Sequence, residues 1–230
     1  MKTSNKLLLT IALITMGSIV LFDLALRAEY LKGQYKNPHY GLTSIPLKDF
    51  DAIEDYTSSE TFLDVKQGKK TEVWLSKEAE KDLEFTVENR ILKINFKVEN
   101  NKDSRSHNIS VICPVLKSLS TGKPAGHPKI VNNWGSVSIT GFTQDTMQIN
   151  VNGPGNVYAG VLFLKKMNAT ITQGSLGVGD GSKADTANFD IRDNCTLNNG
   201  GMQIGKVNYK VEGNATVTLS GSSVHQLSRL

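Results

Sequence analysis

Four five-residue stretches show the clearest pattern in the sequence, each beginning 20 residues after the one before: MQINV at 147–151, MNATI at 167–171, ANFDI at 187–191 and VNYKV at 207–211. In all four, the first, third and fifth residues are apolar and the other two are polar. This alternation is typical of a β-strand that buries one face. Because it returns at a constant interval, each strand is expected to pair in parallel with its equivalent in the next repeat. The pattern predicts an all-β fold, a single-stranded right-handed parallel β-helix with 20 residues per coil.

A weaker second series of strands runs at the same interval through Val137, Val157, Gly177, Leu197 and Val217. Glycine and asparagine gather between the two series, at residues 153–156 (GPGN), 179–181 (GDG), 200–201 (GG) and 213–214 (GN). These residue types tolerate the left-handed backbone conformation that tight corners require. We therefore interpret residues 126–230 as regular coils joined by short corners.

The preceding segment differs in composition, because charged side chains are dense from position 48 to position 105 and sparse after position 126. Short alternating runs predict strands at residues 61–65, 72–75, 83–87 and 91–96, with a hairpin-like turn at 88–90 and one or two helical turns within 76–83. Residues 47–125 are predicted to form irregular first coils, and a small sheet that caps the end of the coils is the alternative. Together, residues 47–230 are expected to be one β-helix domain.

One transmembrane or signal helix is predicted before this domain. Lys2 and Lys6 precede the stretch 7–26, which contains a single charged residue, Asp23. Its 20 residues are about enough to cross the hydrocarbon core of a bilayer. No clear small-residue cleavage site follows, which favours an uncleaved anchor over a cleaved signal peptide. Residues 1–28 are thus assigned to the anchor or signal and residues 29–46, which contain several glycines and prolines, to a linker.

Composition excludes several classes of protein and site. The 230 residues carry 26 basic and 22 acidic side chains, and the resulting net charge of +4 is spread along the chain, so nothing indicates nucleic-acid binding. The two cysteines, Cys113 and Cys195, are too few and too far apart for a zinc site or a disulfide framework, and two buried thiols are expected instead. We predict neither a metal nor a cofactor.

The candidate binding residues lie at the polar positions of the repeat. Asn168, Asn188 and Asn208 share one outward column, where side-chain amides can form a hydrogen-bonded ladder or contact a sugar. Asp190 and Arg192 lie on the same strand as Asn188 or just after it, and Arg192 is predicted to pair with Glu212 one repeat later.

The alternative function is that of a polysaccharide lyase or hydrolase. Asp190, Arg192 and Asp193 resemble the acidic clusters that β-helical enzymes of this class carry on a groove. Acid–base cleavage of glycosides needs two carboxylates about 5–10 Å apart. Nothing in the spacing brings two carboxylates onto one groove, so we expect no catalytic residues and a protein that is not an enzyme.

Several segments resemble the auto-transporter adhesin head GIN domain family, which is common in envelope proteins of gram-negative bacteria. They are FDAI at 50–53, LDVKQG at 63–68, ILKI at 91–94 and, most specifically, ISVICPVLKSL at 109–119. The resemblance covers the chain from about residue 45 to its end. It implies a β-helical extracytoplasmic domain with an adhesin-like role, and it supplies no catalytic residues. The chain departs from the family pattern in having Cys113 before Pro114.

These observations predict a membrane-anchored binding or scaffold module with its domain in the periplasm or at the cell surface. Its expected partners are a glycan or an envelope protein, contacted by the outward strand faces in many shallow polar contacts. The membrane is the other expected partner, through the N-terminal helix.

Overall fold

The apolar N-terminal segment forms one helix, α1 (Thr3–Leu31), in a computed structural model that describes residues 3–37, 39–97, 107–122 and 135–224. Hydroxyl groups within α1 donate to backbone carbonyls of the preceding turn, as from Thr15 Oγ1 to the Ile11 oxygen at 2.9 Å. Polar groups satisfied in this way are tolerated in lipid. The stretch Asn5–Leu31 is long enough to cross a membrane and contains an 18-residue window with a mean hydropathy of 2.3, properties that signal sequences share. A short 3₁₀ helix, η1 (Gln34–Lys36), follows.

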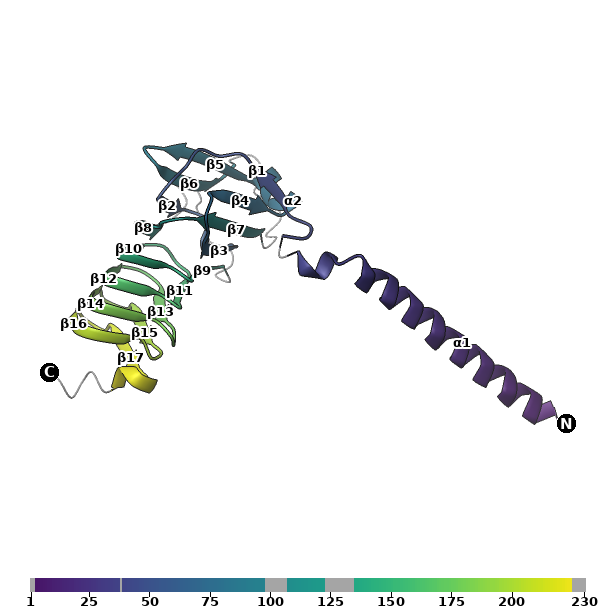
Figure 1. Cartoon of the computed structure of the whole chain (residues 1–230). Coiled ribbons are helices and arrows are strands. Elements are labelled where there is room, and N and C mark those ends of the chain that lie inside the picture. The colour runs from purple at the N-terminus through teal and green to yellow at the C-terminus, as the bar shows by residue number, and fades with distance from the viewer. Residues whose placement is uncertain (1–2, 38, 98–106, 123–134, 225–230) are drawn as a thin grey trace. The chain divides into compact units, whose positions relative to one another are not determined.

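The chain divides into two compact units, Met1–Gly41 and Leu42–Leu230, and the second holds the strands (Figure 1). Among the described residues, strands form two mixed sheets, one of nine strands and one of eight. The nine-stranded sheet has the order β1 (Thr43–Ile45), β4 (Glu72–Leu75), β7 (His107–Cys113), β3 (Thr61–Gln67), β9 (Ser136–Thr140), β11 (Asn156–Gly160), β13 (Ser175–Val178), β15 (Thr196–Asn199), β17 (Thr216–Leu219). The eight-stranded sheet has the order β16 (Gln203–Val211), β14 (Lys183–Ile191), β12 (Phe163–Ile171), β10 (Thr143–Val151), β8 (Ser118–Thr121), β2 (Ala52–Asp55), β6 (Ile91–Phe96), β5 (Leu83–Glu88).

The repeat seen in the sequence sets the register of the eight-stranded sheet. Strands β10, β12, β14 and β16 pair in parallel at the constant interval of the repeat, so that Met147 lies beside Met167 and Met167 beside Ala187. Figure 1 shows these strands as a stack that runs from green to yellow. Equivalent side chains therefore point to the same face on successive strands.

The apolar columns of the repeat form part of the core. Ile149, Ile171 and Phe189 are buried, and the Phe189 ring stacks on Tyr209 with 5.5 Å between ring centroids. The exceptions lie in the outermost strand β16, where Val207 and Tyr209 are partly buried and Val211 is 47% exposed. An edge strand has a neighbour on one side only, so its inward residues are less completely covered.

The predicted fold class, a single-stranded right-handed parallel β-helix, is wrong. The described strands form two mixed sheets, in which β1 with β4, β4 with β7 and β5 with β6 are antiparallel pairs. In addition, β2 lies between β8 and β6, and β3 lies between β7 and β9, so the order of strands in the sheets is not their order in the chain. The cause is that the repeat specifies pairing only from β10 onward, while the earlier segment contains tight turns that reverse the chain.

The second predicted series of strands is wrong at one position. Val157 in β11 pairs with Leu176, not Gly177, and Leu176 pairs with Leu197. The interval in the nine-stranded sheet is therefore one residue shorter than the main repeat at this step and one residue longer at the next. Because side chains alternate between the two faces, the shift by one residue places Leu176 in the core and Gly177 on the outer face.

The local predictions for the charged segment are confirmed. The runs at 61–65, 72–75, 83–87 and 91–96 lie in β3, β4, β5 and β6. Asn89 and Arg90, with φ of 49° and 64°, form the turn between the antiparallel strands β5 and β6. Helix α2 (Lys77–Asp82) begins after Ser76, whose side chain accepts a hydrogen bond from the Ala79 amide at 3.2 Å. The domain boundaries predicted at residues 28, 46 and 125 stay predictions.

Candidate functional site

The column of asparagines lies on the outer face of the eight-stranded sheet. Asn168 in β12, Asn188 in β14 and Asn208 in β16 occupy paired positions. Asn188 Nδ2 donates to Asn168 Oδ1 at 2.8 Å, and Asn208 Nδ2 donates to Asn188 Oδ1 at 2.7 Å. The three side chains form a continuous amide ladder.

Each amide of the ladder keeps unused hydrogen-bonding capacity. A side-chain amide has two N–H donors and two acceptor lone pairs. Asn188 uses one donor and one lone pair within the ladder, which leaves one of each for a ligand. Because the ladder already orients the amides, a ligand would bind them with little further loss of side-chain freedom.

A network of ion pairs continues this face beyond the ladder. Arg192 contacts Asp190 at 2.9 Å and Glu212 at 2.7 Å, which confirms the predicted pair with Glu212. Lys210 contacts Glu212 at 2.8 Å and Asp190 at 3.6 Å. The hydrogen bonds from Lys210 and Arg192 lower the pKa of Glu212. Since the four side chains are partly exposed, each pair contributes little to stability and mainly holds the charges in place.

The ladder and part of the ion-pair network line one shallow hollow of about 320 Å³. Its polar lining residues are Asn168, Thr170, Asn188, Asp190, Asn208 and Lys210. Arg192 lies next to it, bonded to Asp190. The five residues predicted as a binding face therefore lie together, and we call Asn168, Asn188, Asn208, Asp190 and Arg192 the polar face.

Asp193 does not join the polar face. Its Oδ1 accepts a hydrogen bond from the backbone amide of Asn214 at 2.7 Å. The side chain thus stabilises the corner of the following repeat, whereas Asp190 is bound to two cations on the strand face. These contacts give each carboxylate a separate structural partner.

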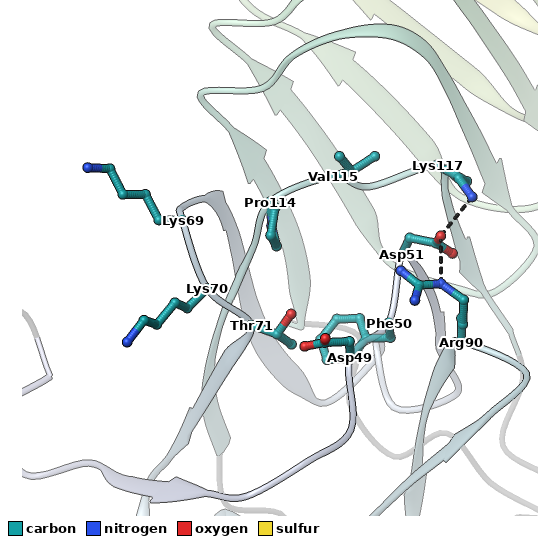
Figure 2. Close-up of a pocket in the computed structure, with 10 residues that line it drawn as sticks. All are labelled: Asp49, Phe50, Asp51, Lys69, Lys70, Thr71, Arg90, Pro114, Val115 and Lys117. Carbon is teal, nitrogen blue, oxygen red and sulfur yellow. Dashed lines mark hydrogen bonds and ion pairs between the residues drawn. The ribbon is translucent and has the colours of Figure 1, made fainter.

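A second hollow, of about 650 Å³, was missed by reasoning from the sequence (Figure 2). It lies where the chain enters β2, at the turn between β3 and β4, at the turn between β5 and β6, and before β8. We call it the basic hollow, and its lining residues are Asp49, Phe50, Asp51, Lys69, Lys70, Thr71, Arg90, Pro114, Val115 and Lys117. The signal available in the sequence was the charge density of residues 48–105, which does not indicate which charges meet.

Asp51 organises one side of the basic hollow. Its Oδ2 atom accepts from Arg90 Nε at 3.0 Å and contacts Lys117 Nζ at 2.7 Å, as the dashed lines in Figure 2 show. Burial alone would raise the pKa of Asp51, but the hydrogen bonds and charges of Lys117 and Arg90 outweigh it and lower the pKa. Asp51 is therefore a charged counter-ion shared by two cations.

The two cysteines are buried free thiols, as predicted. Burial raises the pKa of Cys113 to about 12, so this thiol is not a reactive thiolate at neutral pH. Over residues 3–37, 39–97, 107–122 and 135–224, no group of three His, Cys, Asp or Glu side chains is arranged to hold a metal ion.

Comparison with known proteins identifies the family. Residues 49–224 match the family described as "Putative auto-transporter adhesin, head GIN domain", which confirms the resemblance found in the sequence. No curated protein matches the chain.

Solved structures similar to this chain include two putative adhesins. That from Bacteroides fragilis is 13% identical, with a TM-score of 0.46, and the match covers 77% of this chain and 95% of the other. That from Parabacteroides distasonis is 16% identical, with a TM-score of 0.46, and the match covers 77% and 96%. A putative lipid binding protein from Parabacteroides distasonis is 15% identical, with a TM-score of 0.36 and coverage of 78% and 96%.

Proposed function

The chain belongs to the family of the auto-transporter adhesin head GIN domain, and from this premise we propose that it is an extracytoplasmic, membrane-anchored binding module whose polar face contacts a glycan. The adhesin-like family and the apolar N-terminal helix support an anchored or secreted extracytoplasmic domain. The polar face as the contact surface and the glycan as the ligand are our own additions.

The observation that carries this proposal is the amide ladder over the shallow hollow. Asn168, Asn188 and Asn208 are held in line by two hydrogen bonds and lie on neighbouring strands of a sheet, a stiff support. Adjacent strands are about 4.8 Å apart, so the unused donors and acceptors recur at that interval. A preordered row of this kind favours a ligand that also repeats.

A glycan matches the chemistry of this row. Sugar hydroxyls both donate and accept hydrogen bonds, as the spare groups of each asparagine do. The hollow of about 320 Å³ is shallow and open, which suits a chain lying along the sheet better than a small molecule enclosed in a cavity. The affinity of each contact would be small, and binding would depend on several contacts made at once.

The test is an array of bacterial and host glycans probed with the full-length chain in nanodiscs. We expect retention of selected intact glycans. The triple variant Asn168→Ala, Asn188→Ala, Asn208→Ala should bind them at least about tenfold more weakly. The matched control is Ser138→Ala, Asn198→Ala, Thr218→Ala, which truncates three outward polar residues of the nine-stranded sheet and should bind as the wild type does.

Two outcomes would contradict the proposal. Equal binding by the two triple variants would show that the amide ladder is not the contact surface. Cleavage of retained glycans, abolished by changing Asp190, Arg192 and Asp193 to alanine, would instead establish the enzymatic alternative. Thermal unfolding of each variant checks that a lost signal does not reflect a lost fold.

A further inference from the structure

The basic hollow has a rigid wall, although its residues come from distant parts of the chain. The Lys117 amide donates to the Asp51 carbonyl at 2.6 Å, and the Asp51 amide donates to the Arg90 carbonyl at 3.0 Å. These backbone bonds run alongside the side-chain contacts of Asp51 with Arg90 and Lys117. Both kinds of contact hold the two cations at defined positions, which is a requirement for a preorganised site.

The hollow carries more positive than negative charge. Its lining includes four cations, Lys69, Lys70, Arg90 and Lys117, and two acids, Asp49 and Asp51. Asp51 is already shared between two of the cations. Within the described part of the chain, Lys69 and Lys70 have no acidic partner, so positive charge remains for a ligand.

Arg90 is set up to recognise an anionic group. It uses Nε for Asp51, and among the described residues neither of its Nη groups has a hydrogen-bond partner. An arginine fork can bind both oxygens of a carboxylate. Arg90 also has a φ of 64°, at the second position of a two-residue turn where glycine is preferred. A strained position occupied by a long cationic side chain points to a role for that side chain.

An apolar strip separates the two groups of cations. Figure 2 shows Lys69 and Lys70 extending outward on the side away from Asp51, with Pro114 and Thr71 between. Val115 is 41% exposed beside Pro114, and Phe50 is buried at the base. A phosphate ion gains no hydrophobic stabilisation from contact with apolar surface, whereas the C–H face of a sugar ring can cover that surface and be stabilised by it. Lysine side chains are flexible enough to close over an anion from the far side.

From this combination we propose that the basic hollow binds a polysaccharide carrying carboxylate groups, of the uronic acid type. One carboxylate binds the Arg90 fork near Asp51, the sugar ring covers Pro114 and Val115, and a neighbouring carboxylate meets Lys69 and Lys70. No residue of the basic hollow belongs to the polar face, so this is a second binding site and its test does not depend on the function proposed above.

The experiment measures binding of hexagalacturonate by calorimetry, with the full-length chain in nanodiscs of zwitterionic lipid. Neutral maltohexaose and inorganic phosphate are the comparison ligands. We expect hexagalacturonate to bind at least about tenfold more tightly than either, and to weaken as NaCl rises from about 50 to about 300 mM.

Two matched double variants separate the site from general electrostatics. Lys69→Gln with Lys70→Gln should weaken hexagalacturonate binding at least about tenfold. Lys77→Gln with Lys81→Gln changes the net charge equally, at exposed positions of α2 outside the hollow, and should bind within about twofold of the wild type. Arg90→Gly should lose binding while it keeps the turn, since glycine adopts this φ readily, and unfolding measured in parallel shows that the fold is intact.

Any of three results would overturn the proposal. Equal affinity for maltohexaose and hexagalacturonate would remove the role of charge. Equal binding by the Lys69/Lys70 and Lys77/Lys81 variants would place the interaction elsewhere. Phosphate binding as tight as that of hexagalacturonate would overturn the assignment to a sugar.

Discussion

The buried carboxyl of Asp55 is expected to make the stability of the protein depend on pH. It ends β2, and its Oδ1 accepts hydrogen bonds from the Thr57 amide at 2.8 Å and the Thr57 hydroxyl at 2.7 Å. Its Oδ2 is buried and has no hydrogen-bond partner among the described residues. Burial raises its pKa from 3.8 to about 6, against the opposing effect of the Thr57 bonds. The folded protein therefore retains the proton of Asp55 to a higher pH than the unfolded chain does.

We predict that Asp55→Asn stabilises the protein at neutral pH. Because the folded pKa is raised, the contribution of Asp55 is most favourable below pH 3.8 and is lost as pH rises through about 6. Asparagine keeps the acceptor for Thr57 and carries no charge. The free energy of unfolding should exceed that of the wild type by up to about 3 kcal/mol at about pH 7 and by little at about pH 4. Urea unfolding across this range measures the difference.

Asp51→Asn is the control, because the pKa of Asp51 is shifted in the opposite direction to that of Asp55. Its pKa is lowered in the folded state, so the stability that Asp51 contributes is present above its unfolded value of 3.8 and is lost as pH falls. This variant should be less stable than the wild type at neutral pH and approach it in acid. A wild-type-like pH dependence in Asp55→Asn would refute the assignment of that carboxyl.

At the scale of the element, one corner of the repeat has a fixed conformation. Positions 141, 161, 181, 201 and 221 all have positive φ, from 55° to 122°. Four of them are glycine, and the fifth is Val161, with φ of 55°. A β-branched residue rarely adopts this conformation, because its Cβ approaches the backbone too closely. The corner is therefore strained at one repeat only among those described.

We predict that Val161→Gly stabilises the protein by about 1 kcal/mol, since relief of the left-handed strain exceeds the extra freedom of glycine in the unfolded chain. Val161 is 49% exposed, so little buried surface is lost. The reciprocal change, Gly181→Val, should destabilise by a similar amount. No atom lies within 4 Å of the position that a Cβ would occupy at Gly181, so the main cost of that variant is expected to be backbone strain. Thermal unfolding of both compares them, and a loss of stability in Val161→Gly would contradict the argument.

In the whole molecule, the proposed function places the helix of the unit Met1–Gly41 in lipid and the unit Leu42–Leu230 in water. Every large apolar side chain described in α1 is exposed, whereas most of those in the second unit lie in its core. An exposed apolar helix of this length is stable in a lipid bilayer and costly in water.

We predict that the full-length chain stays in the membrane fraction after an alkaline carbonate wash. The double variant Leu13→Arg, Ile14→Arg should be released to a large extent, because each charge near the centre of a spanning helix costs about 3 kcal/mol. The control is Lys165→Gln with Lys166→Gln, which changes exposed residues of β12 and should stay in the membrane. Quantitative release of the wild-type chain would show that α1 is not an anchor.

The asparagines of the polar face were predictable because their positions follow the sequence repeat. Asn168, Asn188 and Asn208 recur at the same constant interval that sets the pairing of their strands, so the ladder follows from the repeat. The core position of Leu176 was not predicted. The interval from Val157 to Leu176 is one residue shorter than the repeat and the interval from Leu176 to Leu197 is one residue longer, so the overall period is unchanged. A constant repeat cannot reveal such a local slip.

The apolar helix, the family, the parallel register from β10 to β16 and the glycine corners could be predicted from the sequence, because each depends on residue types at recognisable spacings. The placement of β2 between β8 and β6, and of β3 between β7 and β9, could be seen only in the folded protein. Those pairings join residues at irregular separations, and they depend on which apolar faces can be buried together. The same pairings bring Asp51, Arg90 and Lys117 together, so the basic hollow is a product of long-range packing.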